Sequence, residues 1–359
     1  MSLLWLAGPV SAGQNTLALM ESEFKSIVAS VHPCVVKVIA TCNVTLGRIP
    51  PLQGELVVGE RSVDHCYQNV GSGTIINRQG HIVTTAAVVQ NATTIEVVFA
   101  DGQALEGKLL GLDAPTDLAV IAIEGGELPA VKIGDSGNIS MGSWVVAIGR
   151  SYGQSPTVSF GFVNGMEALP DRPFYDAMMV NARVNPGNSG GVIVNMAGEA
   201  VGLIAATLAE PDFSQYSTLP QPLKDQPALW QATIQQERIW KGGDISFAIP
   251  MNTVVNIADQ LAKKGKVARG WLGLRPVEQF DTQAKENGVR VQEVFDNSPA
   301  HQAGIQADDL IFEFNGQPIR TFLDLKRVVA NTLPKTRVLV KVQRGKKTQH
   351  LNVTLGEMQ

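Results

Sequence analysis

Short apolar runs separated by turn residues recur along the first two thirds of the chain. From about Phe24 to Thr207 they alternate with turns that contain glycine, aspartate or asparagine, a spacing typical of antiparallel β-barrels. The runs that we expect to form strands are Val35–Ala40, Gly73–Ile76, Thr94–Phe99, Leu118–Ile123, Trp144–Ile148 and Gly198–Ala206. The pattern therefore predicts a mainly β body.

Residues 208–243 interrupt this rhythm, because they are rich in proline and glutamine. We expect a long, partly ordered loop with one helix near Ala228–Trp240, and a disordered insertion is the alternative. A strand pattern returns at Ser246–Pro250. Val254–Lys264 then has the apolar spacing of a helix that ends at Gly265, before a basic linker.

A second unit of roughly 90 residues begins at Gly270, and this length suits a small compact domain. It opens with Trp271-Leu272-Gly273-Leu274. The pattern predicts a helix at Phe322–Ala330, followed by closing strands at Val338–Gln343 and His350–Leu355.

Composition limits the classes of function that the chain can have. A length of 359 residues suits two domains, and 44% hydrophobic with 17% charged residues argues against disorder. The net charge is −4 and the basic residues are scattered, which argues against a nucleic acid partner. No apolar run is long enough to cross a membrane.

Residues 1–23 form an N-terminal segment with some features of a secretory signal. A short apolar run precedes Val10-Ser11-Ala12, which has the small residues of a cleavage site. The positive charge that usually opens a signal is missing, so an ordinary chain terminus is an equal alternative.

The three cysteines are Cys34, Cys42 and Cys66. Cys34 lies in a strand-like run, and we expect it to be a buried hydrophobic residue. Cys42 and Cys66 flank a polar segment, so we expect a disulfide in an oxidising compartment, with free thiols as the alternative. No cysteine or histidine spacing suggests a metal site, and the sequence indicates no cofactor.

The run Asn185-Pro-Gly-Asn-Ser-Gly-Gly191 carries the strongest chemical signal. A serine attacks a carbonyl only when a base takes its proton and donors face the oxyanion that forms. Without a side chain at Gly187, the loop can aim the N–H groups of Gly187 and Ser189 into one cavity. The candidate oxyanion-hole residues are Gly187, Asn188 and Ser189. An ordinary turn between two strands is the alternative reading of this run.

Taken together, these segments resemble the HtrA (Deg) family, in which a chymotrypsin-like serine protease is joined to a PDZ domain. The motifs that carry the resemblance, in family order, are Gly71-Ser72-Gly73, Ile82-Val83-Thr84, Thr116–Val120, Val145–Gly149, Asn185–Gly191, Phe247–Pro250 and the opening at Gly270. The resemblance implies a trypsin-like double β-barrel at residues 24–250, a helix and linker at 251–269, and one PDZ domain at 270–357.

By this resemblance, Asp117 and Ser189 are the catalytic aspartate and serine. The family histidine follows Ile-Val-Thr, and here that position is Ala87. Alanine can neither accept the serine proton nor protonate the leaving amine. We expect none of the five histidines, His32, His65, His81, His301 and His350, to replace it.

The resemblance also places Arg183 and Ala205 at the primary specificity pocket. The family usually has a small residue where this chain has Arg183. An arginine there would fill the pocket or favour an acidic side chain, and an arginine that points to solvent is the alternative.

In the PDZ unit, the backbone N–H groups around Leu272-Gly273-Leu274 are expected to bind the terminal carboxylate of a peptide that adds as a strand. Phe322, Leu325 and Val329 would line the groove for its last side chain. The alternative is that Trp271 and Leu274 belong to the domain core.

Three hypotheses of function follow. The first is an HtrA-like quality-control protein that binds unfolded or C-terminally exposed polypeptides, as a chaperone or scaffold, with its peptidase site disabled at Ala87. The alternative is an ATP-independent serine endopeptidase whose catalytic histidine was substituted, giving an inactive, substrate-trapping form. A third is an assembly protein, because family members form trimers. The resemblance implies a periplasmic or otherwise extracytoplasmic location and a homo-oligomer, a trimer or a multiple of one.

Overall fold

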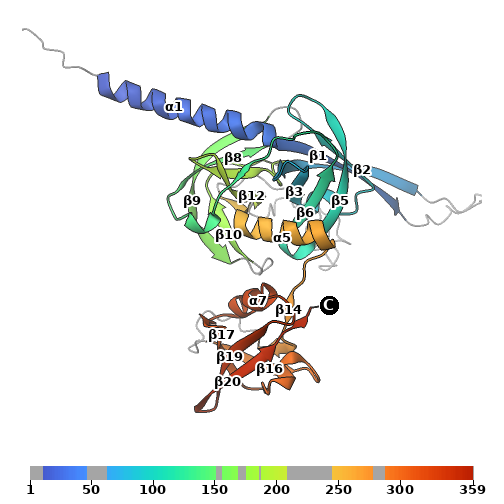
Figure 1. Ribbon diagram of the computed structural model, residues 1–359, viewed down its shortest axis with the longest axis vertical. Helices are drawn as coiled ribbons and strands as arrows, with labels where there is room; N and C mark the ends of the chain where they lie inside the picture. Colours follow the sequence, from blue (N-terminus) through green and yellow to red (C-terminus); the bar gives the residue numbers. More distant parts are fainter. Residues whose placement is uncertain are drawn as a thin grey trace, which may run out of the picture. The chain divides into compact units, whose positions relative to one another are not determined.

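The computed structural model describes residues 11–46, 63–150, 156–168, 175–185, 187–207, 245–277 and 288–358 (Figure 1). The expected loop at 208–243, with its helix, lies outside the described residues. Contacts divide the chain into two compact units. The first holds residues 1–110, 119–165 and 178–255, and the second holds residues 111–118, 166–177 and 256–359.

Six strands close the first barrel in the order β1-β2-β3-β6-β5-β4. Their bounds are β1 (Val35–Leu46), β2 (Val63–Ile75), β3 (His81–Thr85), β4 (Thr94–Val98), β5 (Ala104–Asp113) and β6 (Leu118–Ile123). In β4, Ile95 and Val97 are buried whereas Thr94 and Glu96 are exposed. This period of two is the reason that the alternating sequence forms a strand with one face in the barrel core.

Six further strands form the second barrel, in the order β11-β8-β9-β10-β13-β12, and β12 pairs back to β11. The short β7 joins β12 in parallel. Their bounds are β7 (Lys132–Ile133), β8 (Trp144–Gly149), β9 (Thr157–Ala168), β10 (Asp176–Val180), β11 (Val192–Asn195), β12 (Glu199–Thr207) and β13 (Ser246–Pro250). The predicted strand at Ser246–Pro250 is therefore confirmed, as is the mainly β, double-barrel fold class.

Helix α5 (Met251–Lys264) confirms the helix predicted after the last barrel strand. Its buried residues recur at the helical spacing i, i+3, i+4 and i+7, namely Val254, Ile257, Ala258 and Leu261. Short helical turns complete this part of the chain: η1 (His32–Cys34), α2 (Ala86–Val89), η2 (Ala114–Thr116) and η3 (Ser136–Asn138).

Helix α1 (Ser11–Val31) corrects the expectation that β structure begins near Phe24. Ile27 and Val31 are buried, and with Phe24 they have a helical spacing of three and four residues. His32 follows α1 directly and lies in η1, not in a strand. Among the helices that the structure describes, none combines the length and the apolar character needed to span a membrane.

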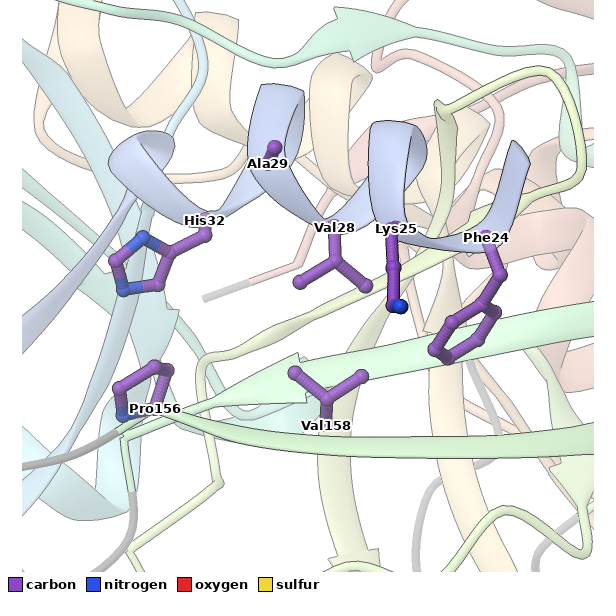
Figure 2. Close-up of a pocket in the computed structure, with 7 residues that line it drawn as sticks. All are labelled: Phe24, Lys25, Val28, Ala29, His32, Pro156 and Val158. Carbon is purple, nitrogen blue, oxygen red and sulfur yellow. The ribbon is translucent and has the colours of Figure 1, made fainter. Parts of the chain in front are cut away.

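An apolar groove of about 350 Å³ lies between α1 and β9 (Figure 2). Its lining residues are Phe24, Lys25, Val28, Ala29, His32, Pro156 and Val158. Beside it, the ring of Phe24 meets Phe160 edge to face at 5.9 Å, and Phe160 meets Trp144 at 5.2 Å. Phe160 and Trp144 are each 41% exposed, so this face presents large apolar side chains to solvent. Burial, together with the charge of Arg150, lowers the pKa of His32.

The second unit carries a sheet in the order β15-β16-β17-β19-β20, with β18 on β17 and a separate pair β14-β21. The strands are β14 (Gly270–Trp271), β15 (Leu274–Pro276), β16 (Val289–Val294), β17 (Leu310–Phe314), β18 (Gln317–Pro318), β19 (Arg337–Arg344), β20 (Lys347–Thr354) and β21 (Gly356–Glu357). Helices α6 (Pro299–Gln302) and α7 (Phe322–Ala330) complete the unit, and α7 matches its predicted bounds. A capping box between Thr321 and Asp324 begins α7.

Candidate active site and peptide-binding site

The loop at 185–191 connects β10 to β11 and is held by β2 of the first barrel. The backbone N–H of Ser72 donates to the carbonyl of Ser189 at 2.9 Å. The Ser72 hydroxyl donates to the Gly187 carbonyl at 2.7 Å, and the Thr74 hydroxyl donates to the Gly190 carbonyl at 3.0 Å. Three of the loop carbonyls therefore point toward the same strand.

The N–H groups of the loop divide into two sets. Three of them donate to backbone carbonyls at 2.8–3.0 Å: that of Asn188 to Asn185, that of Gly190 to Ile204 and that of Gly191 to Asn188. The N–H groups of Gly187 and Ser189 have no acceptor among the described residues. Both residues are partly exposed. Two neighbouring backbone donors are therefore available to a ligand atom.

Asn188 is buried, and its side chain holds the loop from the second barrel. The hydroxyl of Thr157 in β9 donates to the Asn188 side-chain oxygen at 2.7 Å. A side chain at Gly149 would overlap that of Asn188. Both the N–H and the side-chain oxygen of Asn188, a predicted oxyanion-hole residue, are thus hydrogen-bonded within the protein.

Ala87 lies in α2 and is exposed, whereas its neighbours Ala86 and Val88 are buried. A side chain at Gly71 would overlap Val88 and come within 3.2 Å of the Ser189 carbonyl. The turn that carries Ala87 is therefore close to the serine loop. The Ala87 methyl group offers no proton acceptor at this place.

The Ser189 hydroxyl makes one long hydrogen bond, donated to the carbonyl of Ala205 at 3.4 Å. Ala205 is buried in β12. The Arg183 side chain, between β10 and the serine loop, is exposed.

Asp117 belongs to the second unit. It is 5% exposed and adopts a left-handed backbone conformation, with φ of 58°, at the end of η2. Asp113 caps this turn by accepting from the N–H and hydroxyl of Thr116. Arg269 donates two hydrogen bonds to Asp113, at 2.7 and 2.5 Å.

Asp113 and Arg269 form an ion pair that the sequence does not predict. Both side chains are buried, with 6% and 10% exposure, and the residues are 156 positions apart. A buried bidentate pair of this kind holds its two segments firmly, because separating the charges would leave one of them unpaired. The only signal in the sequence was the basic character of the linker.

Among the described residues, no hydrogen bond joins a histidine to the serine loop. His81 contacts the Asn77 amide at 3.0 Å, and His301 accepts from the N–H of Asn297 at 3.3 Å. His32 lies in the α1 groove (Figure 2), and His350 is in β20. His65 falls within β2.

The predicted disulfide between Cys42 and Cys66 is wrong in this structure, where both thiols are free. Cys42 pairs with Tyr67 in the β1-β2 ladder, and Cys66 pairs with Asn43. Because successive side chains alternate between the faces of a strand, the two thiols point to opposite faces. Cys42 is buried and Cys66 is exposed, whereas Cys34 is buried as predicted.

In the PDZ unit, Leu272 and Gly273 connect β14 to the edge strand β15. Their carbonyls accept from Ala300 and Phe295, at 2.8 and 3.0 Å. Their N–H groups have no acceptor in the part of the chain that the structure describes. The edge strand and the two available donors provide the backbone groups that an added peptide strand requires.

The other predicted groove residues separate into core and surface. Leu272, Leu325 and Val329 are buried in one apolar cluster, and Leu274 packs against it. Phe322 is partly exposed at the start of α7. Trp271 is partly exposed and stacks on Phe295 at 6.4 Å.

We expect Gly273→Ala to abolish the binding of a C-terminal peptide. Gly273 has φ of +76°, and a side chain there would overlap that of Ser298, so the loop would have to move. Gly316→Ala is the matched control, because its φ is +81° and the space around it is open. Fluorescence anisotropy of a labelled peptide measures the loss. Equal affinities of the two variants would contradict this account of the loop.

Comparison with known proteins agrees with these features. Residues 71–203 match the trypsin-like peptidase domain, and residues 270–355 match the PDZ domain. A probable periplasmic serine endoprotease DegP-like from Pseudomonas putida (strain W619) is 30% identical over 98% of this chain and 73% of its own length. A protein of the same description from Halomonas elongata is 29% identical over 99% and 75%.

Two solved structures share the fold. The HtrA-type protease AlgW with decapeptide superposes with a TM-score of 0.72 at 24% identity, covering 94% of this chain and 99% of its own. The serine endoprotease from Yersinia pestis superposes with a TM-score of 0.63 at 25% identity, covering 94% and 98%. Fold and site thus define a trypsin-like serine peptidase domain joined to a PDZ domain. The chain belongs to the HtrA family of DegP-like serine endoproteases.

Proposed function

We propose that this protein is a quality-control protein that binds unfolded or C-terminally exposed polypeptides, and that its peptidase site is disabled by Ala87. One observation carries the proposal. The N–H groups of Gly187 and Ser189 have no acceptor among the residues that the structure describes, yet the neighbouring turn bears an exposed alanine instead of a base. Removing the base from a serine triad costs on the order of a millionfold in turnover.

The alternative is that the chain is an endopeptidase whose catalytic histidine was replaced, leaving a form that traps substrate. The intact serine loop supports this alternative as much as it supports the first proposal. Under both proposals, the N–H groups of Gly187 and Ser189 form the oxyanion hole. Asp117 is the remaining acidic member of the triad, and Arg183 and Ala205 belong to the specificity pocket.

Peptide capture is assigned to the PDZ unit, through the loop at Leu272-Gly273-Leu274 and the groove beside α7. We further propose that the protein is periplasmic, or at least extracytoplasmic, and a homo-oligomer, a trimer or a multiple of one. The exposed aromatic rings of Trp144, Phe160 and Phe162 support assembly, because contiguous apolar patches are typical of interfaces.

Incubation of the purified chain with unfolded casein tests the proposed function. We expect casein to be retained on the immobilised protein and to remain intact by mass spectrometry. A Ser189→Ala chain, treated alike, shows the background cleavage. Cleavage at ordinary protease rates that disappears in Ser189→Ala would refute the disabled site, and failure to retain casein would refute the binding role.

A further inference from the structure

Ser72 is fully buried at 0% exposure in β2, and all of its polar groups are used. Its hydroxyl accepts from the N–H of Arg150 at 2.8 Å and donates to the Gly187 carbonyl at 2.7 Å. Its carbonyl accepts from the Thr84 hydroxyl at 2.7 Å, and its N–H donates to Ser189. Ser72 thus lies at the centre of a network that joins both barrels to the serine loop.

Gly187 needs an external constraint of this kind. Its φ is +91°, and a residue without a Cβ atom has a wide choice of backbone conformations. Its N–H has no acceptor among the described residues, so no hydrogen bond to them fixes the direction of that N–H. On the other side, two hydrogen bonds hold the peptide unit between Gly187 and Asn188. One runs from the Ser72 hydroxyl to the Gly187 carbonyl, and the other from the Asn188 N–H to Asn185.

We infer that Ser72 is a positioning residue, which keeps the N–H of Gly187 directed beside that of Ser189. The inference rests on the proposed function in one respect, because it takes these two N–H groups to be the oxyanion donors. Loss of the Ser72 hydroxyl would also leave the Arg150 N–H and the Gly187 carbonyl without their partner. Buried polar groups are rarely left without a hydrogen bond. The loop would rearrange to find one.

Thr74 provides a matched control within the same strand. Its hydroxyl is also buried and also donates to a loop carbonyl, that of Gly190. The N–H of Gly190 is already bonded to Ile204, so neither oxyanion donor belongs to that residue. Thr74→Val removes the hydroxyl with little change of shape. It should therefore lower stability without moving Gly187.

A peptide aldehyde labelled with ¹³C at its carbonyl tests the role of Ser72 without first restoring a histidine at position 87. The Ser189 oxygen adds to the aldehyde carbon, and the hydroxyl proton passes to the carbonyl oxygen, giving a hemiacetal whose oxygen faces the two N–H groups. The aldehyde lacks the carboxylate that a PDZ domain binds. NMR titration therefore reports the serine loop, and Ser189→Ala gives the background.

We expect Ser72→Ala to weaken hemiacetal formation at least about tenfold, since a lost oxyanion donor costs 10²–10³ in rate. Thr74→Val should stay within about twofold of the unchanged chain, and thermal unfolding shows that both variants are folded. In an Ala87→His background, Ser72→Ala should lower kcat and leave KM unchanged.

Equal hemiacetal formation in Ser72→Ala and Thr74→Val would overturn the inference, whether or not the histidine restores cleavage. If Ser72→Ala does not fold, Ser72→Thr replaces it and must retain the adduct.

Discussion

Ala87→His is expected to raise peptide hydrolysis at least about a thousandfold, because under the proposed function it supplies the missing base beside Ser189 and the two backbone donors. A triad that lacks its histidine loses on the order of 10⁶ in turnover, while the oxyanion donors and substrate binding persist. Here the Ser189 hydroxyl makes one long hydrogen bond within the described structure, and position 87 is exposed and close to the serine loop. An imidazole can therefore enter without displacing core residues.

The measurement is the release of fluorescent peptides from labelled casein, compared with the unmodified chain. Gln90→His is the matched control, because position 90 is also exposed and follows the same turn but is not the family position. A second control, Ala87→His with Ser189→Ala, must be inactive. An Ala87→His chain that binds casein but does not cleave it would contradict this prediction and favour a site that had lost more than its base.

The second large effect is expected for Gly190→Ala, which should unfold the protease domain or destabilise it by more than about 3 kcal/mol. Gly190 has φ of +88°, and an added Cβ atom would overlap the Ser72 carbonyl and the Thr84 hydroxyl. A backbone carbonyl cannot turn aside as a flexible side chain can. Relief would therefore require separating the serine loop from β2.

Gly102→Ala is the control, because it carries the cost of the left-handed conformation without the overlap. Gly102 has nearly the same φ, +91°, but nothing lies within 4 Å of an added Cβ atom. The left-handed conformation by itself costs roughly 1–2 kcal/mol. Urea unfolding followed by circular dichroism measures both variants. If their free energies of unfolding agreed within error, the contact between Gly190 and Ser72 would not be the cause.

Some of this molecule could be predicted from neighbouring residues alone. The strand at Ser246–Pro250 and the helix at Phe322–Ala330 were predicted with their observed bounds, because alternation and helical spacing are local patterns. The expectation of β structure from Phe24 was wrong. The apolar residues there have helical spacing, and only their packing against the second barrel distinguishes a helix from a strand at this place.

The order of the elements, the PDZ unit and the loop that carries Ser189 could be predicted without a structure, since each depends on residues close together in the chain. The groups that hold that loop could be found only in the folded molecule. Ser72 and Gly187 are 115 residues apart, and Asp113 and Arg269 are 156 apart. It also placed Cys42 and Cys66 on opposite faces of one ladder. Such partners are brought together by packing and strand pairing between segments far apart in the chain, whereas a local pattern reports only on residues close together.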